Sequence, residues 1–148
     1  MFAVNVEAAI FKEDKWLLIR RSEKEEHAGG CLSLVGGQVD KESAASSDIL
    51  ERTLIREVDE EIGIEVSNLS YVNSSSFITD SGIHVVDIVF LCKGFVGEAF
   101  AKSSDEVDEV VWMTTQEILN HADLPVYLKE NIKLADRLNS EHLASSRT

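Results

Sequence analysis

The chain has 148 residues, with 14 Lys and Arg against 27 Asp and Glu, so its formal net charge is −13 with His neutral. Hydrophobic residues make up 44% of the chain, a fraction typical of a globular protein and too high for a disordered one. The acid surplus argues against nucleic acid and against an anionic membrane as partners, because Lys and Arg hold both. The two cysteines are too few for a disulfide scaffold, and the N-terminus lacks the basic region of a signal peptide. We therefore expect a cytoplasmic protein.

The first quarter of the chain predicts short strands separated by loops. Apolar runs over Phe2–Phe11 and Trp16–Arg20 flank a polar turn and predict a hairpin. The charged segment Ser22–Gly30 predicts a loop. A short strand over Cys31–Val35 is expected to stop at the pair Gly36–Gly37, because glycines commonly interrupt strands.

The clearest predicted helix covers Asp48–Ile62. Asp48 with Glu51 three residues later fits a capping box, and Gly63 fits a C-terminal stop. Its apolar residues recur every four positions, which predicts one buried stripe. The stripe consists of Leu50, Leu54, Val58 and Ile62.

The rest of the chain predicts strands followed by helices. The expected strands are Leu69–Ile78, Ile83–Phe95 and Val107–Met113, and the expected helices are Thr115–His121 and Val126–Leu138. This order favours an α/β fold in which a mixed sheet packs against helices. We expect one domain over residues 1–139 and a frayed tail over residues 140–148.

Three glutamates lie on one side of the predicted helix. Glu57, Glu60 and Glu61 span an arc of roughly 100° at about 100° per residue. Such carboxylates repel one another unless a cation joins them, and Mg²⁺ prefers oxygen ligands. The cluster is therefore a candidate Mg²⁺ site. The alternative for an acidic helix face is simple exposure to solvent.

The segment that holds these glutamates resembles a known family motif. Residues Arg56 to Ile64 follow the pattern Arg-Glu-apolar-x-Glu-Glu-x-Gly-apolar after a Gly-Gly loop, and this is similar to the box of the Nudix (MutT-like) hydrolases. The first half of the box differs from the family pattern. Asp48 occupies the place of a family glutamate, Val35 occupies that of a common proline, and the loop is longer, with the extra length assigned to residues 41–47.

The resemblance implies an α/β/α sandwich and a hydrolase. Nudix hydrolases cleave the diphosphate linkage of a nucleoside diphosphate joined to another group, and they need Mg²⁺ or Mn²⁺. Carried over by position, Glu57, Glu60 and Glu61 would bind the metal. Arg56 would orient a glutamate through a charge-assisted hydrogen bond.

The general base is left open by the resemblance, since it can be a helix glutamate or an acidic residue of a later loop. Glu106 and Glu109 are the loop candidates, and Glu106 is favoured. The alternative for both is a solvated loop.

Substrate-binding candidates lie at the ends of two strands. Arg20 and Arg21 end the second strand, and only one of them should face the cleft because strand side chains alternate. Gly36 and Gly37 would let the chain turn tightly and approach the helix.

Several other residues are expected in the core rather than in the site. The aromatic candidates for stacking on a base are more typical of a core; they are Phe11, Phe77 and Trp112. Cys31 and Cys92 lie in apolar runs and are expected to be buried and inert. The residues His27, His84 and His121 share no metal-ligand spacing.

The sequence leaves the substrate open between a nucleoside triphosphate, including an oxidised one, and a nucleotide sugar such as ADP-ribose. A non-catalytic nucleotide-binding or regulatory module on the same fold is the alternative function. The presence of all three carboxylates favours the enzyme. The family resemblance also implies a homodimer.

Overall fold

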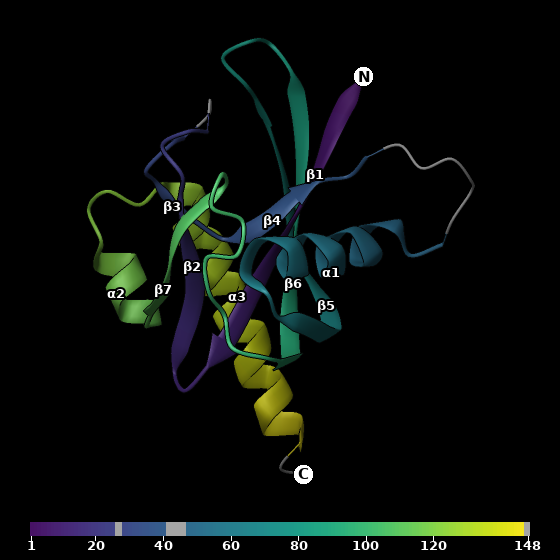
Figure 1. Ribbon diagram of the computed structural model, residues 1–148. Coiled ribbons are helices and arrows are strands. Elements are labelled where there is room, and N and C mark those ends of the chain that lie inside the picture. Colours follow the sequence, from purple (N-terminus) through teal and green to yellow (C-terminus); the bar gives the residue numbers. More distant parts are fainter. Residues whose placement is uncertain (26–27, 41–46, 147–148) are drawn as a thin grey trace.

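The computed structural model describes residues 1–25, 28–40 and 47–146. Its elements in chain order are β1 (Phe2–Lys12), β2 (Lys15–Arg21), β3 (Leu32–Ser33), β4 (Val35–Gln38), α1 (Ile49–Ile62), β5 (Glu65–Ile78), β6 (His84–Val96), β7 (Val107–Met113), α2 (Thr115–Asn120) and α3 (Val126–Ser146). Strands run in the order β3-β2-β1-β6-β5, with β4 paired to β1 and β7 to β2. The β1–β6 pair is parallel and the other pairs are antiparallel, so the sheet is mixed as predicted. α1 lies on one face of the sheet and α3 on the other (Figure 1).

Alternation along the central strands divides the core between the two faces. In β1, Val6 and Ala8 pack in the cluster that contains the buried stripe of α1, whereas Ala9 packs in the cluster that contains α3. β2 alternates in the same way, with Leu17 on the α1 side and Leu18 on the α3 side. Period-2 side-chain direction in a strand that is covered on both faces explains why these runs are almost wholly apolar.

The predicted hairpin, the later strands and α1 are confirmed, with different ends for several elements. β5 begins at Glu65, before the predicted Leu69, because its polar first residues pair through the backbone with the end of β6. α3 continues to Ser146 beyond the predicted end at Leu138, so residues 140–146 are helical rather than frayed. None of the described helices is long and apolar enough to cross a membrane.

The glycine pair does not stop a strand, which corrects the sequence expectation. Gly36 and Gly37 lie inside β4 and pair with Glu7 and Val6 of β1. A Cβ on Gly36 would lie 1.9 Å from the backbone oxygen of Val6. Glycine is therefore needed here because β4 lies very close to its neighbours in the fold, and not because the chain turns.

The start of α1 also differs from the prediction. Asp48 has a left-handed backbone with φ of 56°, and its side chain caps no helix N–H, so the predicted capping box with Glu51 is wrong. An N-cap side chain accepts from the first turn when its backbone is extended, and the left-handed conformation removes that geometry. The predicted C-terminal end of the helix is confirmed, because Gly63 has a left-handed backbone and its N–H donates to the backbone carbonyl oxygen of Asp59 at 3.0 Å.

The partners of β1 create an opening in the sheet. On the edge away from β6, residues 5–8 of β1 pair with β4, and only residues 11 and 12 pair with β2. β2 therefore diverges from β1 along most of its length and pairs with β7 instead. This divergence places a cavity between β1, β2 and β4, beside the first turn of α3.

Candidate active site

The three predicted glutamates of α1 differ in exposure. Glu61 is buried with 6% of its surface exposed, whereas the side chains of Glu57 and Glu60 are 15% and 55% exposed. The helix spacing thus places Glu61 against the fold and Glu60 toward solvent.

Glu106 is brought to this cluster by the segment before β7. The backbone N–H groups of Lys102 and Ser103 donate to the Glu61 carbonyl oxygen at 3.0 and 3.3 Å, which ties this segment to the end of α1. The Glu106 side chain is hydrogen bonded to the Glu61 side chain and acts electrostatically on Glu57. Glu109 instead pairs with Arg20, with 2.7 Å between the Glu109 Oε1 and the Arg20 Nε.

The electrostatics of the cluster disfavour negative charge. Burial, followed by the charges of Glu106 and Glu57, raises the pKa of Glu61 to about 8. Burial also raises the pKa of Glu57, opposed by the neighbouring Arg56 charge. The buried Glu61 Oε2 finds no hydrogen-bond donor in the described residues. Ionised carboxylates only accept, so the hydrogen bond between the Glu61 and Glu106 side chains requires that one of the two hold a proton.

These donors suit a divalent cation. A buried carboxylate oxygen without a donor, next to further carboxylates from α1 and the β7 approach, is the oxygen-rich environment that Mg²⁺ takes. In the described part of the chain, no three Asp, Glu, His or Cys side chains stand close enough together to form a complete metal site. The Glu60 side chain is directed to Arg56. Bringing its carboxylate to a metal shared with Glu57 and Glu61 therefore requires rotation of the Glu60 side chain and no change of fold.

Arg56 lies where it can orient two of the glutamates. Its Nη1 is 3.3 Å from the Glu57 Oε1 and 3.4 Å from the Glu60 Oε1. A guanidinium that contacts both carboxylates limits their rotation and reduces their mutual repulsion. Gly37 supports Glu57 from the sheet side, because a Cβ there would lie 2.5 Å from the Glu57 Cδ.

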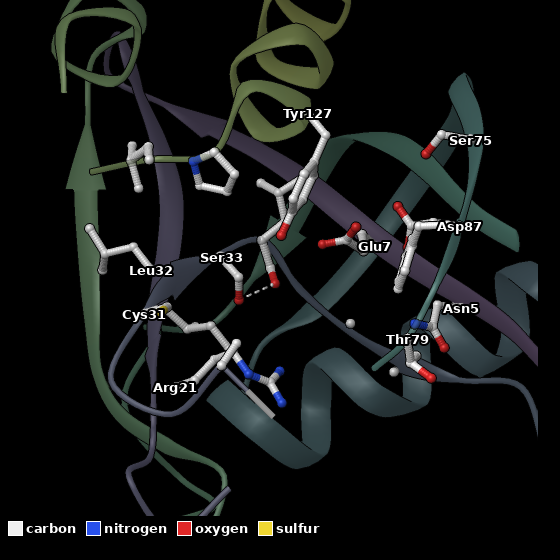
Figure 2. A pocket seen from close by; sticks show the side chains of 18 of the residues that line it. Asn5, Glu7, Arg21, Cys31, Leu32, Ser33, Ser75, Thr79, Asp87 and Tyr127 are labelled. Atoms are coloured by element: carbon white, nitrogen blue, oxygen red, sulfur yellow. Dashed lines mark hydrogen bonds between the residues drawn. The ribbon is translucent and has the colours of Figure 1, made fainter. Parts of the chain in front are cut away.

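A cavity of about 980 Å³ opens beside this cluster, and both Gly36 and Gly37 line it. Arg20 and Arg21 also line it but differ in their partners. Arg20 is bound to Glu109 and to the Gly30 carbonyl oxygen, at 2.7 and 3.0 Å. Arg21 extends into the cavity (Figure 2), and its charge lowers the pKa of both Glu61 and Glu7.

The cavity residues that were not among the sequence candidates include Glu7, Asp87 and Tyr127. Figure 2 shows them directed into the cavity from β1, β6 and α3. A single acid inside an otherwise apolar strand is a signal that would have found the first two, because charged residues are rarely buried without a role.

The remaining candidates are scattered. Two of the aromatic candidates pack against other rings: Phe11 on Trp16, and Trp112 on Phe95. The third, Phe77, lines the cavity and is 44% exposed, so it does not lie in the core. Cys92 is buried as expected, but Cys31 is exposed because it ends a loop and does not belong to β3. His84 contacts Phe2, His121 lines the cavity, and His27, like residues 41–46 of the proposed loop insertion, lies outside the described residues.

Comparison with known proteins identifies the family. The model of the NUDIX domain matches residues 1–134. The chain belongs to the Nudix family. A comparison with curated protein sequences found no match.

Solved structures of Nudix proteins share this fold. A MutT Nudix hydrolase from Burkholderia pseudomallei is 27% identical, with a TM-score of 0.76 over 90% of this chain and 98% of that one. A MutT protein from Methanosarcina mazei Go1 is 29% identical, with a TM-score of 0.79 over 93% and 95% of the two chains. The Nudix domain of Shewanella oneidensis NrtR, solved with ADP ribose, is 20% identical, with a TM-score of 0.74 over 93% and 89%. The chain is thus a Nudix hydrolase with the predicted α/β fold.

Proposed function

We propose that this Nudix hydrolase cleaves the diphosphate linkage of a nucleoside diphosphate derivative, with Mg²⁺ or Mn²⁺ held by Glu57, Glu60 and Glu61. The observation that carries the proposal is the buried Glu61 side chain, whose Oε2 has no donor among the described residues and which is acted on by Glu57 and Glu106 beside a cavity. A carboxylate in that position is costly unless a cation binds it. Family membership is consistent with this chemistry.

Each residue then has a distinct role in the proposed reaction. Glu57, Glu60 and Glu61 would hold a divalent ion, which when bound would supply positive charge for the diphosphate and make water more acidic at the site. Arg56 keeps Glu57 and Glu60 directed at the site. Glu106, which contacts Glu61, accepts the proton as the water oxygen attacks phosphorus and the bond from phosphorus to the bridging oxygen breaks. Arg21 and the backbone of Gly37 face the phosphate groups.

The test is phosphate release from nucleoside triphosphates, 8-oxo-dGTP, ADP-ribose and nucleotide sugars, with and without Mg²⁺. We expect Mg²⁺-dependent cleavage of one of these classes, and mass analysis of the products to show which linkage breaks. Glu61→Gln should lower kcat by about two orders of magnitude or more, since the metal supplies several kcal/mol of transition-state stabilisation.

Asp59→Asn is the matched control. It removes one negative charge from the same helix at a side chain that is 60% exposed and pairs with Lys102 at 3.6 Å. Its kcat should stay within about twofold of the wild-type value, because exposed ion pairs contribute little. Full activity of Glu61→Gln would contradict the metal-ligand assignment, and full activity in EDTA would contradict the metal requirement.

The alternative function, a non-catalytic nucleotide-binding module, predicts binding without turnover by the same panel. We keep a cytoplasmic location and a homodimer as predictions. Size-exclusion chromatography with light scattering tests the second.

A further inference from the structure

Two carboxyl side chains meet at the floor of the cavity. Glu7 of β1 and Asp87 of β6 come from neighbouring parallel strands, where Asp87 pairs in register with Asn5. Their side chains are hydrogen bonded to each other, and Asp87 is only 5% exposed. Ionised carboxylates can only accept hydrogen bonds, so this contact requires that the pair hold a proton.

The walls of the cavity suit a flat ligand. Tyr127 and Phe77 are 62% and 44% exposed, and both line the cavity. Exposed aromatic rings offer faces on which a planar group can stack. Figure 2 shows Tyr127, Glu7 and Asp87 directed into one space, with Arg21 between them and α1. A nucleotide whose base stacks on one of these rings would share the cavity with Arg21 and with Gly37, which adjoins Glu57.

Resting on the function proposed above, we propose that Glu7 and Asp87 are specificity-determining residues that select a nucleobase carrying an exocyclic amino group. An amino group is a donor only, and the Asp87 carboxylate is an acceptor only, so the two are complementary. When a base binds, the single O–H of Glu7 would turn from Asp87 to the ring nitrogen beside the amino group, because that nitrogen is an acceptor in cytosine and adenine. Burial and the Asp87 contact raise the pKa of Glu7 well above its ordinary value, against the opposing charge of Arg21, which is consistent with the proton residing on Glu7.

Bases without an amino group should be rejected. Uracil held in the same position by the phosphates and the stacked ring would place a carbonyl oxygen against the Asp87 carboxylate and its ring N–H against the Glu7 O–H, so both contacts would be mismatched. A site that must leave a buried polar group unpaired discriminates strongly against the wrong ligand. Arg21 and Tyr127 are the other titratable groups that act electrostatically on this pair.

The experiment uses two pairs of nucleotides that differ at this edge, CTP against UTP and ATP against ITP. For each we would measure kcat/KM with Mg²⁺ and the dissociation constant by calorimetry. The wild type should prefer the amino-bearing member of a pair by at least about tenfold, through KM rather than kcat. Asp87→Asn should reduce this ratio to near one, because its amide can donate to a carbonyl oxygen. Glu7→Gln should retain a preference, because its amide replaces the protonated carboxyl with one donor and one acceptor.

Two controls separate the possible failures. Asp80→Asn removes a charge at the exposed rim of the same cavity and should leave the ratio unchanged. Only variants that give the wild-type circular dichroism spectrum are compared, so that a changed ratio does not reflect loss of folding. Equal binding of both members of each pair by the wild type, or an unchanged ratio in Asp87→Asn, would overturn the inference. Binding with the expected ratio but no cleavage of any substrate would uphold it and contradict the proposed hydrolysis.

Discussion

Glu61 combines burial with like charges, and this has a consequence for stability as well as for metal binding. Its pKa is about 8 in the folded protein against an ordinary value of 4.5. Between these two values the folded state binds more protons than the unfolded state. In the absence of metal, the free energy of unfolding should therefore fall as pH rises from about 4.5 to about 8.

Glu61→Gln should remove much of that slope. At pH 8 in EDTA the variant should be more stable than the wild type by roughly 2–5 kcal/mol, since each pKa unit corresponds to about 1.4 kcal/mol. Urea unfolding at pH 5 and pH 8 measures this. Asp59→Asn should keep the wild-type slope. An identical slope in Glu61→Gln would show that Glu61 is ionised in the folded protein at both pH values.

The cysteines should differ in reactivity. Burial raises the pKa of the Cys92 thiol to about 12, whereas Cys31 is exposed. Because the thiolate is the reactive form, an alkylating reagent at pH 8 should label the native protein once, at Cys31, and the urea-unfolded protein at both positions. Mass spectrometry of digested protein locates the labels. Rapid labelling of Cys92 in the native state would mean that β6 opens readily.

At the scale of elements, β4 links the sheet to the carboxylate helix through its two glycines. Gly36→Ala places a methyl group against the backbone of β1, so the unfolding free energy should fall by about 2–4 kcal/mol. Gly37→Ala places it against the side chain of Glu57, which can rotate away. Stability should then change by less than about 1 kcal/mol while kcat falls at least about tenfold, because small displacements of catalytic groups are costly. Parallel urea titrations and kinetics of the two variants test this contrast, and equal effects on activity and stability in both would refute it.

Sequence patterns predict those elements that are determined by residues close together in the chain. The apolar spacing of Leu54, Val58 and Ile62 found α1, and helix geometry placed its three glutamates on one side. The glycine pair predicts the end of a strand, whereas both glycines lie inside β4. The reason is not local, because the backbone that crowds Gly36 belongs to β1, about 30 residues earlier in the sequence.

Each acid of the cavity floor stands out within an apolar strand, but local patterns could not predict that the two meet. Glu7 and Asp87 meet only because β1 and β6, which are far apart in the sequence, pair in parallel. The family motif indicated Glu57, Glu60 and Glu61, and the family resemblance made Glu106 a candidate as an acidic residue of a later loop. The β1–β6 register leaves no periodic trace near either Glu7 or Asp87.

At the scale of the whole molecule, the net charge of −13 favours binding of cations. Mg²⁺ at about 100 times its dissociation constant should add about 2.7 kcal/mol of stability and raise Tm by roughly 5–10 °C. NaCl at equal ionic strength is the control, because it screens charge without binding the carboxylates. The rise should vanish in Glu61→Gln and persist in Asp59→Asn. A rise of the same size in both variants would place the ion elsewhere.

The central position of β1 also affects how the protein is made. β1 leaves the ribosome well before its parallel partner β6, which ends only at Val96. At about 5–20 residues per second, the apolar strand waits on the order of 5–15 s for that neighbour. Parallel pairing between distant segments is also slow to form. Newly synthesised chains therefore expose β1 during translation, and chaperones that shield apolar segments should raise the yield of native protein.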